Sequence, residues 1–131
     1  MNATPPLPSP QRAVVLFAHG SRDPLWRQPI EAVALRMVNT APQVPVRCAY
    51  LELCAPDLDT VFHELLALGV QAITVVPMFL GVGKHAREDL PLLIQALQAQ
   101  HPRMHLILRP AIGEDPAMIE LMAKIALSSR E

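Results

Sequence analysis

The sequence predicts an α/β fold in which helices cover both faces of a parallel sheet. Short, almost wholly apolar segments recur along the chain, and each is followed by a segment whose apolar residues recur at helical spacing. Strands that are apolar throughout are typical of a sheet that is buried on both faces. Because strand and helix alternate four times, we expect the strands to run parallel, joined by right-handed crossovers.

The first strand–helix unit and the second strand lie before residue 52. Residues 12–18 are the first expected strand. Asp23 and Pro24 then suit the N-cap and the first position of a helix that ends near Asn39. The apolar stripe of this helix is Trp26, Ile30, Val33 and Met37. Residues 44–51 are rich in β-branched and aromatic side chains and predict the second strand.

The second helix and the third strand follow. Pro56 and Asp57 open the helix, and Gly69 is placed to cap its end. The apolar face of this helix is Leu58, Val61, Phe62, Leu65 and Leu66. The third strand is expected at residues 71–78, with Pro77 near its end, where a missing N–H group matters least.

Two further helices and one strand complete the pattern. Pro91 is expected in the first turn of the third helix, whose core residues are Leu93, Ile94 and Leu97. Residues 104–108 predict the fourth strand. Asp115 and Pro116 open the last helix, which carries Met118, Leu121, Met122 and Ile125.

The composition is that of one globular domain. The chain has 131 residues, of which 51% are hydrophobic, so a core can offset the ordering entropy of folding. We expect residues 12–131 to form this domain. Residues 1–11 are rich in proline and lack the charged and then apolar pattern of a targeting signal, which predicts a disordered leader.

Charge and cysteine content restrict the classes of partner. A formal charge of −1 and an aromatic content of 4% argue against nucleic acid or an anionic membrane as ligand. No apolar segment approaches the roughly 20 residues that span a bilayer. The spacing of Cys48 and Cys54 matches no zinc motif, so we expect reduced cysteines in a cytoplasmic protein.

Topology predicts where a site would form. For a small sheet of this kind we expect a flavodoxin-like strand order, 2-1-3-4, whose switch point lies between the first and third strands. The loop after the first strand contains His19, and the loop after the third contains His85. Glu52 follows the second strand and can reach the same rim. Either histidine alone could simply cap or donate a hydrogen bond, but together at the switch point they predict a shared functional role.

The chemistry of these residues favours a metal and an anionic ligand. Two imidazoles bind a borderline divalent metal such as cobalt, nickel, iron(II) or zinc. Three nearby cations could pair with a polycarboxylate ligand; they are Arg22, Lys84 and Arg87. Each could equally be an ordinary solvated surface side chain, and for Arg87 this is the better explanation. For the remaining histidines we expect only structural roles; these are His63, His101 and His105.

Other sites are less well supported. The glycines near residue 83 resemble part of a phosphate-binding loop, but the full pattern needs a glycine where this chain has Met78, and serine or threonine where it has His85. A flavodoxin-like phosphate or flavin site would need a phosphate-cradling loop after the first strand, where the chain has His19 and Arg22. No serine or cysteine nucleophile with an elbow motif is evident at the rim.

Three motifs in order resemble a known family. They are His19-Gly20-Ser21-Arg22-Asp23-Pro24, Tyr50-Leu51-Glu52-Leu53, and the segment from Val76-Pro77-Met78-Phe79-Leu80-Gly81 to His85-Ala86-Arg87-Glu88-Asp89-Leu90-Pro91. The chain is similar here to the short sirohydrochlorin chelatases, the CbiX-type class II chelatases of cobalamin and siroheme synthesis. The similarity extends from about Ala13 to Leu127.

This resemblance implies an activity and its residues. It implies a chelatase-like domain that inserts Co²⁺, or alternatively Fe²⁺, into sirohydrochlorin without ATP, with the metal as substrate and no tightly bound cofactor. His19 would bind the metal and accept a proton, and His85 would be the second metal ligand. The substrate contacts would be Glu52, Arg22, Leu80, Gly81, Val82, Gly83 and Lys84.

A carrier and a dimer are further expectations. A non-enzymatic carrier of metal or tetrapyrrole would keep the same ligands but show no turnover. Because a tetrapyrrole is broader than the crevice of one four-stranded domain, we expect a symmetric homodimer whose two sites face a shared cavity. The last helix could contribute to such an interface, although a core face within the same chain explains its apolar residues equally well.

Overall fold

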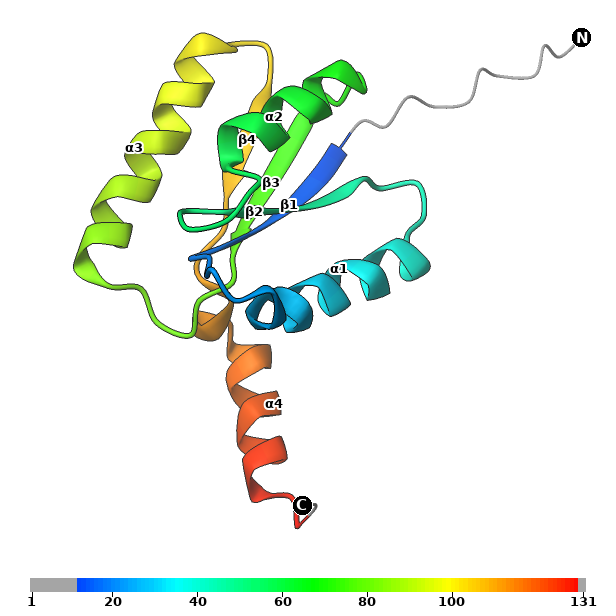
Figure 1. The fold of residues 1–131 in the computed structure, drawn as a ribbon, viewed down its shortest axis with the longest axis vertical. Coiled ribbons are helices and arrows are strands. Elements are labelled where there is room, and N and C mark those ends of the chain that lie inside the picture. The colour runs from blue at the N-terminus through cyan, green and yellow to red at the C-terminus, as the bar shows by residue number, and fades with distance from the viewer. Residues whose placement is uncertain (1–11, 130–131) are drawn as a thin grey trace, which may run out of the picture.

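The computed structural model describes residues 12–129 and has the expected architecture (Figure 1). Its parallel sheet has the order β2-β1-β3-β4. The strands are β1 (Arg12–Ala18), β2 (Val46–Tyr50), β3 (Ala72–Pro77) and β4 (His105–Leu108). The fold class and the strand order are therefore confirmed, whereas the expected leader, residues 1–11, lies outside the described residues.

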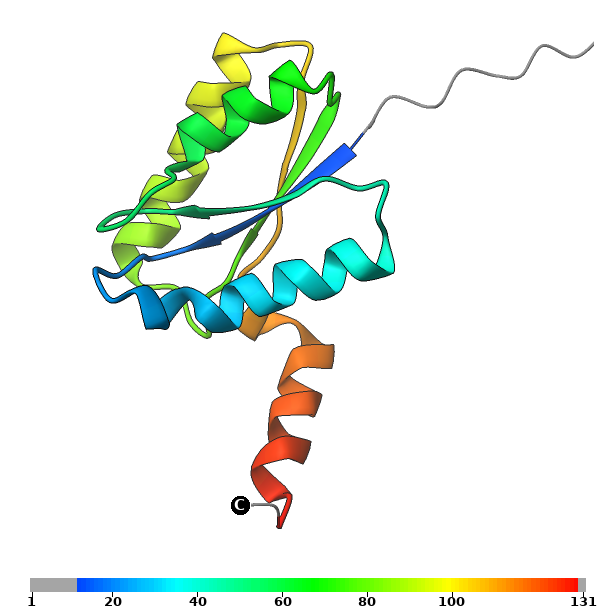
Figure 2. The same cartoon turned by 45° about the vertical axis from the view of Figure 1, so that its right-hand side comes forward.

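Helices cover both faces of the sheet, but unequally. The alternate β1 residues Ala13, Val15 and Phe17 belong to the large core cluster, together with the buried faces of α2 (Leu58–Ala67) and α3 (Lys84–Gln100). Val14 and Leu16 point the other way, into a smaller cluster beneath α1 (Gln28–Thr40). The last helix, α4 (Pro116–Leu127), extends away from the sheet, as a second view shows (Figure 2).

Aspartate caps begin three helical segments as predicted. Asp23 accepts a hydrogen bond from the backbone N–H of Leu25, at the start of the 3₁₀ helix η1 (Pro24–Arg27). Asp57 does the same for Thr60 at α2, and Asp115 for Ala117 at α4. The hydrogen bonds from Thr60 hold the pKa of the Asp57 carboxyl below its usual value. A second 3₁₀ helix, η2 (Ile112–Glu114), precedes α4 and was not predicted.

The apolar stripe predicted for the first helix is only partly correct. Ile30 and Met37 pack against the smaller core cluster. Trp26 and Val33 are exposed: Trp26 lies in the 3₁₀ turn before the helix, and Val33 lies beside the inward-facing row that Ile30, Ala34 and Met37 form. No residue of α1 is fully buried against the described chain.

The predicted start of the third helix was wrong. The helix begins at Lys84, after Gly83 as N-cap, and Pro91 lies inside it. A proline there forfeits one helical hydrogen bond. Burial of Leu90, Ile94 and Leu97 in the core offsets that loss, whereas Leu93, expected in the core, lies partly exposed at a pocket.

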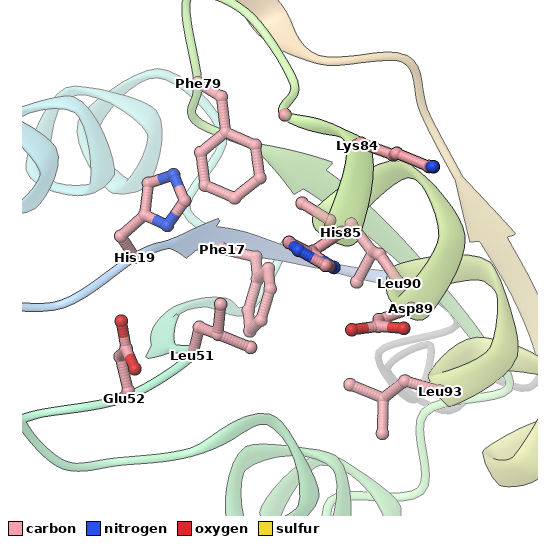
Figure 3. A pocket seen from close by; sticks show the side chains of 12 residues that line it. Phe17, His19, Leu51, Glu52, Phe79, Lys84, His85, Asp89, Leu90 and Leu93 are labelled. Carbon is pink, nitrogen blue, oxygen red and sulfur yellow. The ribbon is translucent and has the colours of Figure 1, made fainter.

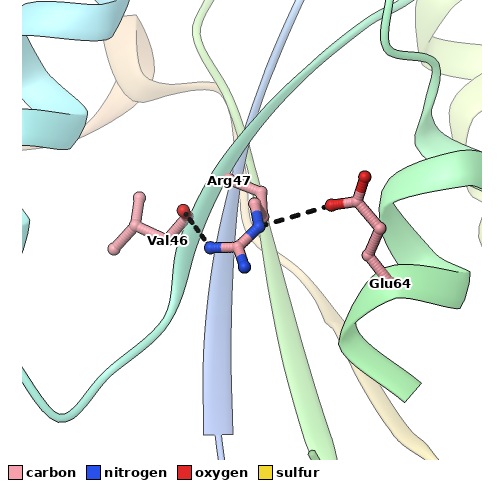
Figure 4. Close-up of polar contacts among 3 residues, drawn as sticks. All are labelled: Val46, Arg47 and Glu64. Carbon is pink, nitrogen blue, oxygen red and sulfur yellow. Dashed lines mark hydrogen bonds and ion pairs between the residues drawn. The ribbon is translucent and has the colours of Figure 1, made fainter. Parts of the chain in front are cut away.

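A surface ion pair links the edge strand β2 to α2 (Figure 4). The Arg47 guanidinium lies 3.4 Å from the Glu64 carboxylate, and its Nη1 donates to the Val46 carbonyl at 3.0 Å. Because both side chains are substantially exposed, we assign this pair no more than about 1 kcal/mol. In the part of the chain that the structure describes, no helix combines the length and apolar character needed to cross a bilayer.

One glutamine organises the connection between α3 and β4. The Gln98 side-chain amide donates to the carbonyls of His101 and Met104, and its Oε1 accepts from the Leu106 N–H at 3.2 Å. The His101 carbonyl also accepts from the Met104 N–H, so the Gln98 side chain is the partner on which the Met104 carbonyl and the Leu106 N–H depend.

We expect Gln98→Ala to lower the free energy of unfolding by about 1–3 kcal/mol, because it removes the side-chain partner of the Met104 carbonyl and of the Leu106 N–H. Gln95→Ala is the matched control, since Gln95 lies one turn earlier on the same helix and is exposed; it should change stability by less than about 0.5 kcal/mol. Urea unfolding measures both. Equal losses in the two variants would show that the network is unimportant.

Candidate functional site

A pocket of about 380 Å³ lies at the edge of the sheet where the strands have their carboxyl ends (Figure 3). The loops after β1 and β2 form one side, and the first turns of α3 form the other. Its apolar lining is Phe17, Leu51, Phe79, Ala86, Leu90 and Leu93, and its polar and charged lining is His19, Glu52, Lys84, His85 and Asp89, with Gly83 at the helix start. The predicted switch point is therefore a real concavity.

Backbone pairing continues past the ends of β1 and β2 and aligns His19 with Glu52. The Leu51 N–H donates to the Ala18 carbonyl, and the Glu52 N–H donates to the His19 carbonyl, each at 2.9 Å. Gly20 makes this approach possible. Its φ is +106°, and a Cβ atom there would lie 1.8 Å from the Glu52 carbonyl oxygen.

The His19 ring is oriented by an aromatic contact. It stacks on Phe79, with ring centroids 4.3 Å apart and an interplanar angle of 28°. Phe79 is buried and packs edge-on against Phe17 at 6.5 Å. An imidazole at the end of a buried strand thus rests on a fixed aromatic wall.

The short helix η2 holds Phe79 in place from behind. The Gly113 N–H donates to the Phe79 carbonyl at 2.9 Å, and a Cβ atom on Gly113 would lie 2.1 Å from the Leu80 carbonyl oxygen. The backbone of residues 79–80 can therefore approach only a glycine. This contact connects the pocket wall to the segment that leads into α4.

The first turn of α3 carries the second imidazole. Lys84 and His85 directly follow the N-cap Gly83, and both are exposed at the pocket. The free N–H groups of a helix start give it a partial positive charge, to which Lys84 adds. Asp89 lies one helical turn after His85 and lines the same pocket.

The structure brings most of the predicted site residues together. His19, Glu52, Gly83, Lys84 and His85 line one pocket. In residues 12–129, no three side chains of histidine, cysteine, aspartate or glutamate lie close enough to form a metal-binding group. The two imidazoles are the candidates for metal contact, with Glu52 and Asp89 as nearby carboxylates.

The other predicted substrate contacts lie outside this pocket. Arg22 is exposed in the turn before Asp23, and Leu80 is 70% exposed at the start of the glycine turn. Gly81 is exposed too, whereas Val82 packs against the large core cluster.

Sequence reasoning missed the apolar part of the pocket. Phe17, Leu51 and Phe79 lie at or just beyond strand ends, where the sequence pattern predicts core residues. Asp89 could have been found from its spacing of four residues from His85, which places both on one helix face, had the helix start been predicted at Lys84.

Cys48 is not an activated nucleophile. It is a free thiol that packs against the smaller core cluster. Burial, and secondarily the Glu31 carboxylate, raise the pKa of the Cys48 thiol, so its thiolate form is disfavoured. Burial likewise raises the pKa of its neighbour Tyr50 to about 12, so this phenol stays neutral beneath the rim and supplies no charge to it.

Comparison with known proteins gives a consistent set of matches. The CbiX family model matches residues 13–128. A sirohydrochlorin cobaltochelatase of Methanopyrus kandleri is 37% identical over 82 residues, which cover 63% of this chain and 57% of that protein. The chain thus spans little more than half the length of this curated relative.

Two solved structures share the fold. The CbiX protein of cobalamin biosynthesis from Marinobacter aquaeolei VT8 is 34% identical, with a TM-score of 0.77 over 88% of this chain and 93% of that one. The sirohydrochlorin chelatase SirB from Bacillus subtilis subspecies spizizenii, in complex with cobalt, is 29% identical, with a TM-score of 0.65 over 88% of this chain and 51% of that one.

We expect Gly20→Ala to lower the free energy of unfolding and to separate His19 from Glu52. The positive φ alone costs an alanine about 1–2 kcal/mol, and the overlap with the Glu52 carbonyl adds to this cost. Gly69→Ala is the matched control, because Gly69 also has a positive φ, +81°, but has open space around it. Thermal unfolding of both variants measures the difference. Equal destabilisation would show that the close approach at Gly20 is unimportant.

Proposed function

Because the chain belongs to the CbiX family, we propose that it inserts a divalent metal ion into sirohydrochlorin, with Co²⁺ as the first candidate and Fe²⁺ as the second. The observation that carries the proposal is the pair of imidazoles, His19 and His85, lining one largely apolar pocket at the switch point of the sheet. The metal is a substrate that passes through this pocket. We place the reaction in the cytoplasm and without ATP.

His19 has the geometry of a proton acceptor and transient metal ligand. Metal insertion removes pyrrole protons from the macrocycle and transfers a partly desolvated metal ion to the ring nitrogens. A neutral imidazole can perform either task through its lone pair. Stacking on Phe79 and the backbone bond from Glu52 to the His19 carbonyl fix the position of this group before substrate binds.

His85 and the two carboxylates of the pocket, Glu52 and Asp89, are the remaining groups that could contact the metal ion. His85 offers a second nitrogen ligand from α3, opposite the strand side that carries His19 and Glu52. Glu52 and Asp89 can attract the cation or accept a proton. Because ligands from two separate elements share the metal with the substrate, the ion is held loosely enough to be transferred.

The pocket lining also suits the macrocycle. The apolar side chains Phe17, Leu51 and Leu93 match the face of a conjugated ring. Lys84 at the pocket can pair with a peripheral carboxylate of the substrate, and Arg22, exposed on the preceding loop, can do so at a greater distance.

We propose a symmetric homodimer as the working unit. The pocket opens at one edge of a small sheet, and a tetrapyrrole bound there would leave much of its surface in water. A second copy related by a two-fold axis would cover that surface with the same residues.

The decisive experiment mixes the purified protein with sirohydrochlorin and Co²⁺, and separately with Fe²⁺, and follows the absorption spectrum over time. Multiple turnovers at a rate above that of the metal and tetrapyrrole alone support the enzyme. Stoichiometric binding without turnover would identify a carrier instead.

We expect His19→Ala to reduce kcat about 100-fold or more, because it removes a proton acceptor and a ligand together. His85→Ala should weaken Co²⁺ binding, measured by calorimetry, and lose most of the rate. His63→Ala is the control, since His63 is an exposed α2 residue whose Nδ1 donates a local hydrogen bond to the Asp59 carbonyl. Parent rates in both site variants would rule out this assignment.

The rate should fall on the acid side, because an imidazolium ion can neither bind a metal nor accept a proton. A rate profile against pH, taken at saturating metal, measures this limb. In the variant that lacks both His19 and His85, the residual rate should no longer fall at acid pH. If the same fall persists in that variant, other groups cause it.

A further inference from the structure

The turn that follows Glu52 contains a strained residue. Leu53 has a φ of +68°, and among the residues that the structure describes, 12–129, it is the one non-glycine residue with a positive φ. A leucine adopts this conformation rarely, because its Cβ atom then lies too close to its own backbone. The side chain is 53% exposed, so its burial offsets little of the strain. The surrounding backbone must therefore hold Leu53 in this conformation.

Hydrogen bonds on both sides of Leu53 impose the turn. Before it, the Glu52 N–H donates to the His19 carbonyl at 2.9 Å. After it, the Cys54 N–H donates back to the Glu52 carbonyl at 2.9 Å, which closes a three-residue turn around Leu53. A positive φ at the centre is the rare and strained form of such a turn.

The chain has little length in which to reverse its direction here. Residues 51 and 52 still pair with the residues at the end of β1. The Tyr50 N–H, at the end of β2, donates to the Pro56 carbonyl at 2.9 Å, so the chain is back beside this strand by residue 56. The reversal is therefore confined to residues 53–55, and the turn at Leu53 begins it.

The turn fixes the backbone on both sides of the Glu52 side chain. The Glu52 N–H is bonded to the His19 carbonyl, and the Glu52 carbonyl oxygen accepts from the Cys54 N–H. The same oxygen lies so close to Gly20 that a Cβ atom there would be 1.8 Å away. Neither peptide group can rotate without breaking one of these contacts. The Glu52 side chain therefore leaves the backbone in one direction, and it lines the pocket on the side that carries His19 (Figure 3).

We propose that Leu53 is a positioning residue, whose strained turn holds the Glu52 carboxylate in the direction in which it contacts the metal ion. This inference rests on the proposed function only in taking a divalent metal as a ligand of the pocket. Leu53 acts through the backbone, since its own side chain is not among those that line the pocket. A glycine there would relieve the strain, but the turn could then adopt other conformations, because glycine has no Cβ atom. Leucine therefore restricts the turn at a cost in strain.

The test measures Co²⁺ binding by calorimetry in the absence of sirohydrochlorin. Leu53→Gly should raise the Kd for Co²⁺ about tenfold, as loss of a group that orients a ligand does. Its melting temperature should stay unchanged or rise, because the relief of strain opposes the extra freedom of the unfolded chain. Leu53→Asn should bind Co²⁺ like the parent, because asparagine adopts a positive φ readily and still has a Cβ atom.

Leu68→Gly is the matched control. Leu68 is 45% exposed, similar to Leu53, but its φ is −81°, so glycine relieves no strain there. This variant should bind Co²⁺ like the parent and melt at a lower temperature.

A double-mutant cycle tests whether Leu53 acts through Glu52. Glu52→Gln alone should weaken Co²⁺ binding, because it removes the charge of the carboxylate. Leu53→Gly should then cause no further loss in the Glu52→Gln background, since the group that the turn orients is already absent. Two losses that multiply would overturn the action through Glu52.

The outcomes separate this inference from the proposed activity. Parent-like Co²⁺ binding by Leu53→Gly would overturn the role of the turn. Binding by Leu53→Asn as weak as that of Leu53→Gly would show that the leucine side chain itself is required, and would overturn the backbone role. A parent protein that binds Co²⁺ but does not metallate sirohydrochlorin would overturn the activity alone, because the binding cycle requires no turnover. A parent that binds no Co²⁺ would overturn both.

Discussion

The position of β1 in the middle of the sheet is the constraint on which the site depends. β1 is hydrogen-bonded to β2 on one edge and to β3 on the other, and its residues are buried on both faces. The residue that follows it can therefore lie only beside the ends of its two neighbours. His19 meets Glu52 on the β2 side through backbone pairing and Phe79 on the β3 side through ring stacking. The His19 imidazole is thus placed by main-chain geometry and by one aromatic contact.

The two walls of the pocket differ in how closely their backbone is packed. The strand side is fixed, because Gly20 and Gly113 each allow a backbone approach that any larger residue would block. The α3 side begins after Gly83, which has open space around it and no side-chain cap. The wall that carries His19 is therefore held by close backbone contacts, whereas the wall that carries His85 begins at a glycine without such contacts.

The sequence predicted the features that arise from periodicity and topology, and failed where tertiary packing overrides a local preference. The strand order, the three aspartate caps and the convergence of His19 and His85 follow from alternation and the switch-point rule. Pro91 misled the prediction because local rules place proline at a helix start, whereas burial of neighbouring core residues extends the helix back to Lys84. Phe79 could not be assigned to the pocket, since an aromatic residue after a buried strand looks the same whether it fills a core or supports an imidazole.

The position of α4 shows the limit of reasoning from one chain. Its apolar pattern is compatible with a core face and with an interface, and periodicity alone cannot separate the two. In the described residues, 12–129, the structure argues against a core face: η2 and Pro116 direct α4 away from its own sheet, and Ile107 stays partly exposed on that sheet. The contact that anchors η2, Gly113 against Leu80, also supports Phe79 beneath His19. The segment that fixes the imidazole wall is therefore the segment that directs α4, so a shift of either would be felt by the other.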